Sequence, residues 1–429
     1  MLIVQVFLLR RFRHICVLFT VLLLTAPPAF SDLGNRNAMP IGDRSAFMAN
    51  TGVADGSSSM AVLLNPGTLG FVDNSKISLS GNLYFNFDVK YSPFLRFNND
   101  SADINVNGFN SVPNSAVSIY KWGENTLAFS VLVPDFQEIS TLQKVRMTNY
   151  DGVVQYNGKT QDLWVGATFS RKWREKYGIG LSLFGTRYST QSAADISASV
   201  VLGNLPVAIN IMENRQGAAI SLESVIGIFF RPTERLATGL KFAPPGIRVS
   251  GSGSFYSVNR NVVNGVVSTT IDDRQNLDFY HYRPADGSLG GEFRFSDELR
   301  WYLDASLQFP LQFQAMPAAS DPKNVQLQYT PRLSTGLDIH VYKFFSVMTG
   351  LAWIPSATAP LEPKFRGNSR AANYLTTLGI IYSDRHVRTG LGAFVLYADG
   401  VQQIDEKEGN IGAIRAIGTG ALLSSSYEF

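Results

Sequence analysis

Few residues of this chain could do chemistry, and their spacing does not assemble a site. After residue 31 the sequence holds three histidines, His281, His340 and His386, and no cysteine. The ligands of a structural zinc site usually come in pairs about three to six residues apart, and these histidines are not paired in that way. A hydrolase would need a serine and a histidine presented together, but His386 lies in an expected turn and His281 in an expected loop. We therefore expect no metal, no cofactor and no enzyme activity.

The first 31 residues read as a secretory signal peptide. Three arginines precede an apolar run over residues 15–24, and Ala29-Phe30-Ser31 offers small residues for cleavage before Asp32. A retained membrane anchor is the alternative, but the run is short for a helix that must cross about 30 Å of hydrocarbon. Because Cys16 is the only cysteine and lies in this segment, the mature chain has no disulfide.

The mature chain carries almost no net charge. Residues 1–31 hold three of the 37 basic residues and no acidic one, so their removal leaves 34 basic against 34 acidic side chains. A nucleic-acid partner would need a concentrated basic face, and we expect none. After Ser31 no apolar run approaches the roughly 20 residues of a membrane-spanning helix. If this exported chain enters a membrane, it must do so as strands.

Segments that alternate apolar and polar residues predict an all-β fold, a transmembrane antiparallel β-barrel of about 14 strands. In the last segment Ala421, Leu423 and Tyr427 share one parity and Ser424 and Ser426 the other, so one face suits lipid and the other a wet interior. The expected strands span 76–88, 113–122, 125–135, 161–173, 175–187, 217–231, 234–246, 284–297, 299–314, 325–341, 343–355, 371–384, 386–398 and 415–429. A transmembrane strand needs about 9–11 residues, and bacterial single-chain barrels have an even number of strands.

Short polar turns alternate with long connections along this series. The expected long loops include 89–112, 136–160, 188–216 and 247–283. Short periplasmic turns and long outer loops are typical of an outer-membrane barrel, so we expect the outer membrane of a Gram-negative-type bacterium and contact with its lipid. The aromatic C-terminal residue Phe429 resembles the signal that the barrel-assembly machinery reads, which makes that machinery an expected partner.

Residues 32–75 differ from everything that follows. They are rich in Gly, Ala, Ser and Asn and lack two-residue periodicity, so we interpret them as an N-terminal plug, or hatch, ahead of a barrel over 76–429. In the segment 299–314 the polar residues Asp304 and Gln308 oppose Leu303 and Leu307 and should face the lumen. Ordinary solvation and pairing inside the barrel is the expected role of such polar groups.

The plug and the strands after it resemble the FadL-type transporters of long-chain fatty acids and aromatic hydrocarbons. The phrases that carry the resemblance are Gly42-Asp43-Arg44-Ser45-Ala46, Val53-Ala54-Asp55, Ser57-Ser58-Ser59, Asn65-Pro66-Gly67-Thr68-Leu69 and the stretches 227–240, 290–299 and 334–338. In that family an Asn-Pro-Ala motif lies in the hatch just before the first strand. Here the third residue is Gly67, so the match is partial.

The resemblance implies a fourteen-stranded barrel closed by a hatch, with Asn65, Pro66, Gly67 and Asp55 as candidate gating residues. It also implies passive diffusion of long-chain fatty acids or other hydrophobic ligands from an outer apolar groove to an interior pocket, and then sideways through a wall opening at a kinked third strand. That strand would be 126–134 here, and Pro134, which cannot donate to a strand ladder, is the candidate for the opening. The alternative is that Pro134 ends a regular strand before a loop.

Two other functions fit the same pattern. One is a surface adhesin or structural barrel whose long loops do the binding, and the other is a general aqueous porin. A gated importer should become leaky to small solutes when its plug is deleted, a porin should change little, and an adhesin should keep its binding. The aromatic residues of the expected loop 89–112, Tyr91, Phe94, Leu95, Phe97 and Phe109, could form the outer groove or simply pack the loops together.

Overall fold

The computed structural model describes residues 38–97, 100–147, 150–202, 205–263, 265–320, 324–360, 369–403 and 411–429. The expected signal peptide over residues 1–31, with Cys16, lies outside them. Within this described part of the chain, no helix is both long and apolar enough to cross a membrane.

Fourteen antiparallel strands close into a barrel, which confirms the predicted fold class and strand number. They are β1 (Lys76–Phe97), β2 (Asp100–Trp122), β3 (Asn125–Met147), β4 (Tyr150–Trp173), β5 (Tyr177–Leu202), β6 (Leu205–Thr233), β7 (Leu236–Ala243), β10 (Asp286–Arg294), β11 (Leu299–Gln308), β14 (Thr330–Tyr342), β15 (Phe345–Ile354), β16 (Ser369–Ser383), β17 (Val387–Gln403) and β18 (Ile411–Glu428). Each strand pairs with its neighbour in this order, and β18 pairs with β1 to close the ring.

An apolar belt encircles the outer face of the barrel, as the alternating pattern predicts. On β3, Phe129 and Val131 are 52% and 44% exposed, whereas Ala128 and Leu132 on the opposite parity are fully buried. Trp122 and Trp173 lie beside the short turns at the end of the barrel that carries the C-terminus. This arrangement matches the aromatic girdle of a barrel in lipid.

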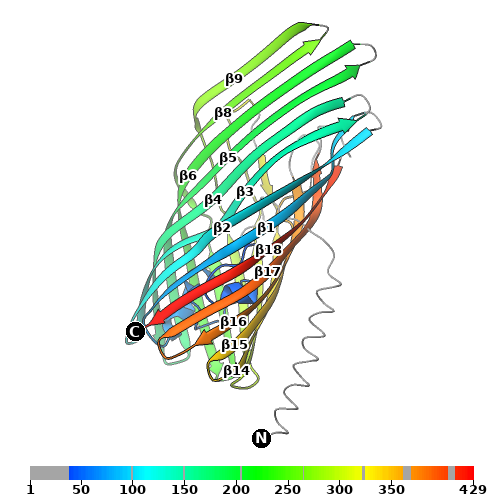
Figure 1. Cartoon of the computed structure of the whole chain (residues 1–429). Coiled ribbons are helices and arrows are strands. Elements are labelled where there is room, and N and C mark those ends of the chain that lie inside the picture. Colours follow the sequence, from blue (N-terminus) through cyan, green and yellow to red (C-terminus); the bar gives the residue numbers. More distant parts are fainter. Residues whose placement is uncertain are drawn as a thin grey trace, which may run out of the picture.

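The barrel is much taller on one side than on the other. Strand β6 is 29 residues long, although about 10 would cross a membrane. The sequences expected to be long loops, 89–112, 136–160 and 188–216, instead continue the strands, and 247–283 is mostly a further hairpin of β8 (Ile247–Val263) and β9 (Val266–Asp278). Figure 1 shows β5, β6, β8 and β9 rising far above β1 and β18. We call the parts of β3–β6 beyond the belt, together with β8 and β9, the crest.

The tips of β1 and β2 pack on the inner face of the crest. Val89 of β1 and Ile104 of β2 form a buried cluster with Val145 of β3. Tyr91 and Phe94, which were expected to help form an outer groove, pack against this cluster, whereas Phe109 is exposed. The side chains of Leu95 and Phe97 lie outside the described ones.

Two connecting segments pack on the inner face of the crest. The first is the connection 279–285 between β9 and β10. The second is residues 311–319, which comprise β12 (Leu311–Gln314) and the start of the turn that leads to β13 (Asn324–Leu327). Phe279 and Met316 pack with Phe255 of β8, and the Tyr280 N–H donates to the Ala315 oxygen. We call residues 279–285 and 311–319 the cover.

The plug lies inside the barrel, near the end with the short turns (Figure 1, dark blue). Over its described residues, 38–75, its helices are short: η1 (Ser45–Met48), α2 (Ala61–Leu64) and η2 (Pro66–Phe71). Nearly all its described side chains before Asp73 are buried, and Phe47, Met48 and Met60 are fully buried. Because these helices are too short to be stable alone, contacts with the wall must hold the plug in shape.

Candidate functional site

Asn65 ties two parts of the plug to the barrel wall. Its side-chain amide donates to the backbone oxygens of Val53 at 2.7 Å and of Ile228 in β6 at 3.0 Å. Its Oδ1 accepts from the Gly67 N–H at 3.0 Å and so caps η2, and Pro66 supplies the first residue of that helix. A side chain with both donor and acceptor atoms is needed to serve all three groups, and Asn65 is fully buried.

Glycines of the wall make a close-fitting seat for this motif. A Cβ on Gly67 would lie 2.8 Å from the Gly227 oxygen, and a Cβ on Gly178 would lie 2.2 Å from the Gly67 oxygen. A Cβ on Gly180 would lie 2.4 Å from the Pro66 carbonyl group. These are backbone contacts that no side-chain rotation relieves. An alanine at position 67 would therefore not fit, which accounts for glycine here in place of the alanine of the resembling motif.

A second seat holds the η1 end of the plug. Phe47 and Met48 pack with Tyr302, Met348 and Phe394 of the wall. Room for the two plug side chains and their backbone comes from five glycines of β14–β17, namely Gly336, Gly350, Gly379, Gly390 and Gly392. The two seats thus hold two parts of the plug, residues 47–48 on β14–β17 and residues 65–67 on β5 and β6.

A buried ionic contact joins Arg44 of the plug to the wall. Its Nε donates to Asp55 of the plug at 3.0 Å, and its Nη2 donates to Asp338 of β14 at 2.9 Å. Burial opposes ionisation of Asp55, but the Arg44 guanidinium and two hydrogen bonds from Ser57 outweigh it, so the pKa of Asp55 falls to about 2 from its ordinary 3.8. Asp55 is thus a charged partner of Arg44 at neutral pH, and we call this contact the latch.

Two further carboxylates reinforce the plug. Asp304 of β11 accepts from the N–H groups of Gly52 at 2.7 Å and Val53 at 3.0 Å, so its lumen-facing position agrees with the sequence pattern. Asp43 of the plug accepts from the Ser59 N–H at 3.1 Å and lies 3.8 Å from the Lys76 ammonium of β1. Burial opposes ionisation of Asp43, but the nearby cations outweigh it and lower its pKa.

The wall ladder is interrupted between β2 and β3. These strands pair only from Trp122 and Asn125 up to Ser115 and Leu132. Beyond that point β2 stays with β1, and β3 stays with β4 after a register shift between Leu132 and Asp135 that contains Pro134. The alternative that Pro134 ends a strand before a loop is wrong, because β3 continues to Met147. We call the unpaired stretch the pairing break.

The first described residues of the plug lie on the inner side of this break. Asn114, the residue next to the last β2–β3 pair, donates to the Pro40 oxygen at 2.9 Å and is itself held by the Ser80 hydroxyl at 2.6 Å. A small cavity of about 20 Å³ remains among Met39, Pro40, Asn82, Phe85, Asn114, Val133, Pro134 and Phe136. The plug thus covers the break from within.

Arg283 connects the cover to the strand beyond the break. Its Nη2 lies 3.5 Å from the carboxylate of Asp135 and its Nε lies 3.8 Å from that of Asp162. The guanidinium also lies over the Trp164 ring, 4.2 Å from its centre. Because Asp135 directly follows Pro134, this arginine helps to position the bulged part of β3.

Sequence reasoning named Asn65, Pro66, Gly67 and Asp55 together, and the structure places them in the plug, with Asn65 and Gly67 in direct contact with the wall. Pro134 lies apart from this group, in the wall beside Met39 and Pro40. Sequence reasoning did not identify Arg44 as an ion-pair partner or Asp338 and Asp304 as wall anchors of the plug. It also did not identify Asn114, which binds Pro40, or Arg283, which binds Asp135. Polar residues of lumen parity on the strands were the available signal, but the pattern does not show which of them meet the plug.

Comparison with known proteins supports the same architecture. No family model and no curated protein matches the sequence. Among solved structures, a FadL homologue of Pseudomonas aeruginosa matches at 14% identity over 91% of this chain and 100% of its own, with a TM-score of 0.59. The toluene transporter TodX of P. putida matches at 12% identity over 91% of this chain and 99% of its own, with a TM-score of 0.61. The Ralstonia pickettii toluene transporter TbuX matches at 12% identity over 92% of this chain and 99% of its own, with a TM-score of 0.58. The chain therefore has the fold of the FadL-type transporters.

Proposed function

We propose that this protein is a passive outer-membrane transporter of hydrophobic small molecules, with long-chain fatty acids as the first candidate substrate. The observation that carries the proposal is the pairing break at Pro134, closed from within by Met39 and Pro40. Where the wall has no backbone ladder, an apolar molecule could leave the lumen sideways without breaking strand hydrogen bonds. Toluene and related hydrocarbons, which the structurally similar TodX and TbuX transport by their names, are the second candidate.

The energetics of such transport need no external source. Burial of each CH₂ group contributes about 0.8 kcal/mol, so an apolar passage would take an acyl chain from water. Release through the break into the apolar part of a membrane keeps that gain. The ligand therefore only has to move from one apolar environment, the passage, to another, the membrane, and this step needs no energy input.

In this proposal residues 32–75 form the hatch of a barrel over 76–429, after removal of residues 1–31. Asn65, Pro66 and Gly67 hold the hatch on its wall seat, Asp55 holds it through the latch, and displacement of its Met39–Pro40 end exposes the pairing break. An open aqueous porin is disfavoured, because a buried plug fills the lumen. Assembly through Phe429 by the barrel-assembly machinery belongs to the same proposal.

The test is growth of a Gram-negative strain that lacks its own long-chain importer, with oleate or toluene as carbon source. Surface display of the barrel is verified by heat-modifiable gel migration. Growth that depends on the barrel on either carbon source supports hydrophobic uptake and names the substrate class. Equal growth with and without a displayed barrel, on both sources, would refute the proposal.

The wall opening is tested separately by a substitution that restores the strand ladder. Replacing Pro134 by valine returns a backbone donor and a strand-forming side chain to β3. We expect slower uptake at equal display. Uptake that stays at the native rate would show that ligands leave by another path.

A further inference from the structure

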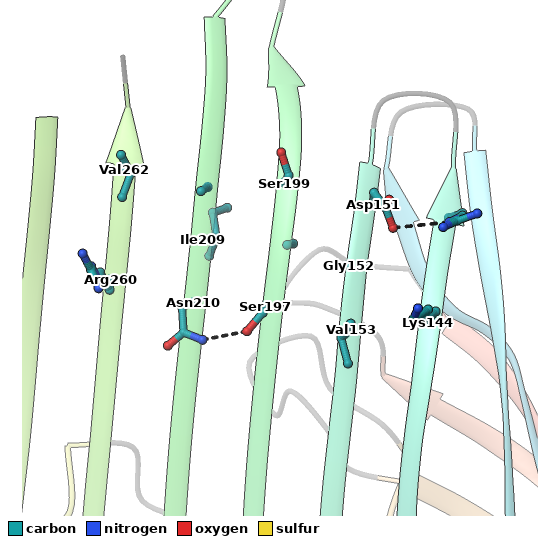
Figure 2. A pocket seen from close by; sticks show the side chains of 13 residues that line it. Lys144, Asp151, Gly152, Val153, Ser197, Ser199, Ile209, Asn210, Arg260 and Val262 are labelled. Carbon is teal, nitrogen blue, oxygen red and sulfur yellow. Dashed lines mark hydrogen bonds and ion pairs between the residues drawn. The ribbon is translucent and has the colours of Figure 1, made fainter. Parts of the chain in front are cut away.

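The outer face of the crest carries two polar hollows, one above the other. The upper hollow has a volume of about 530 Å³ and is lined by Lys144, Arg146, Asp151, Ser197, Asn210 and Arg260. Figure 2 shows it with all of these but Arg146 labelled. The lower one has a volume of about 440 Å³ and is lined by Lys159, Arg187, Gln191, Gln216, Ser254 and Gln275. The residues come from five neighbouring strands, β3–β6 and β8, with Gln275 from β9. The two hollows together form a track that we call the crest track.

Strand register aligns the track residues in straight rows. The upper row is Lys144, Val153, Ser197, Asn210 and Arg260, each paired with the next across β3, β4, β5, β6 and β8. Neighbouring strands lie about 4.8 Å apart, so the two cations bound a floor of short side chains roughly 19 Å wide. In the lower row Lys159, Gln191, Gln216 and Ser254 are aligned in the same way.

These rows face sideways, along the membrane surface. On β5 Ser197 lies 14 positions after Leu183, and on β6 Asn210 lies 10 positions before Ile220, so each pair shares a face. Leu183 and Ile220 are 58% and 47% exposed in the apolar belt, and no register shift interrupts β5 and β6 between these points. With a rise of about 3.3 Å per residue and a tilt of about 40°, the two rows lie roughly 10 and 25 Å above Ile220.

The chemistry of the track suits an anionic saccharide. Its lining includes Lys144, Arg146, Lys159, Arg187 and Arg260 against a single carboxylate, Asp151. Arg146 pairs with Asp151 and Lys159 pairs with Glu138, but among the described residues no carboxylate makes an ion pair with Lys144, Arg187 or Arg260.

The remaining groups are amides and hydroxyls. Asn210 donates to the Ser197 hydroxyl at 2.7 Å and also to Asp195 at 3.2 Å, so the acidic Asp195 between the rows is already hydrogen-bonded. Amides and hydroxyls donate to and accept from sugar hydroxyls, while cations bind phosphate. The track therefore offers both kinds of group that a phosphorylated glycan needs.

We propose that the crest track binds the phosphorylated core saccharide of lipopolysaccharide in the surrounding outer leaflet. That glycan rises from the membrane surface directly beside the track, at the height of both rows. A free saccharide in the medium would have no reason to meet a face that points along the membrane. The inference rests on the outer-membrane location but not on hydrophobic transport, so uptake assays and this binding can fail independently.

The test measures binding of lipopolysaccharide to the full mature barrel refolded in detergent. Two variants are compared with the native chain. The track variant carries Lys144→Ala, Arg187→Ala and Arg260→Ala, and the matched control carries Lys176→Ala, Arg235→Ala and Arg385→Ala, which remove three exposed cations at the opposite end of the barrel. Ligands are lipopolysaccharide with a complete phosphorylated core, the same lipid without that core, and inorganic phosphate.

We expect the native barrel and the control to bind the full-core lipid at least tenfold more tightly than the core-deficient lipid. The track variant should lose this preference while retaining heat-modifiable migration. Equal affinity for the two lipids, equal loss in track variant and control, or competition by millimolar inorganic phosphate alone would overturn the proposal. The last result would mean a site for an adventitious ion only.

Discussion

Removal of Arg44 is the sharpest test of how the plug is held. Arg44→Met keeps the length and the apolar stem of the side chain but leaves Asp55 and Asp338 as neighbouring carboxylates without their shared cation. Both carboxylates are almost completely buried, so water cannot replace the guanidinium. The plug and the wall should then repel each other at the contact that now joins them.

The size of the effect follows from the latch itself. The difference between the pKa of about 2 at Asp55 and its ordinary 3.8 corresponds to about 2 kcal/mol for that carboxylate. Loss of one partner of a buried ion pair typically costs about 3–5 kcal/mol, because the remaining charge is left uncompensated. A change of about 3 kcal/mol raises the population of displaced plug roughly a hundredfold.

Ion conductance of single barrels in a planar bilayer measures that population. We expect frequent open events in Arg44→Met, and partial recovery when Asp338→Asn is added, since that change removes one of the two unpaired charges. Arg235→Met, which removes an exposed arginine from a turn, is the matched control and should stay closed. Native-like closure of Arg44→Met in folded barrels would refute the reasoning that the latch holds the plug.

Four other changes test the remaining contacts. Charged Asp55 stabilises the seated plug fully above its ordinary pKa of 3.8, and this contribution is lost as the pH falls through about 2; conductance should therefore rise on acidification below about pH 4 in the native chain, and less so in Asp55→Asn, where the lowered pKa of Asp43 still contributes. Asn65→Ala leaves two carbonyls and one N–H unpaired, at about 1–3 kcal/mol each, and should lower the urea concentration at which trypsin cleaves the plug; an unchanged midpoint contradicts this. Gly178→Ala should unseat the plug, whereas Gly185→Ala on the same strand, whose Cβ would meet nothing closer than 3.9 Å, should not; equal conductance of the two would count against the glycine seat. Asn114→Ala should speed hydrophobic uptake without raising ion conductance, because it frees only the Met39–Pro40 end; unchanged uptake would exclude that end as the inner seal.

The sequence predicts the strands of the belt well because lipid imposes one rule on them. Every second residue must be apolar, as with Leu181 and Leu183 of β5, so a period of two is visible wherever the wall meets hydrocarbon. Above the belt the outer face meets water, and residues such as Ser197 and Asn210 are as polar as those of a loop. The crest was therefore expected to be loops, although it is made of the same strands.

The plug contacts were less predictable for a different reason. Asp338 and Asp304 are recognisable as lumen residues by their parity, but their partners Arg44 and Gly52 lie about 250 to 300 residues earlier in the chain. Nothing local fixes which polar group of the lumen meets the plug. The Asn65-Pro66-Gly67 motif was recognisable because the helix η2 that Asn65 caps follows it directly in the sequence. Its contacts with Gly178 and Gly227 were not recognisable, because those glycines lie more than 100 residues later in the chain.

If the chain transports as proposed, the distribution of these contacts along the plug accounts for how its end at the break can open without unfolding of the rest. The latch, Asp304 and Asn65 are buried charged or multiply bonded contacts, and all of them lie away from the pairing break. At the break, Met39 and Pro40 are held through two backbone oxygens, by Asn50 at 2.7 Å and by Asn114 at 2.9 Å. At about 1 kcal/mol for each such bond, these two contribute about 2 kcal/mol, less than the roughly 3–5 kcal/mol of a buried ion pair such as the latch. Release of the latch is therefore at least several-fold rarer than release of this end. A ligand in the lumen can therefore reach the break while the rest of the plug still blocks water and ions, and an energy source is not required.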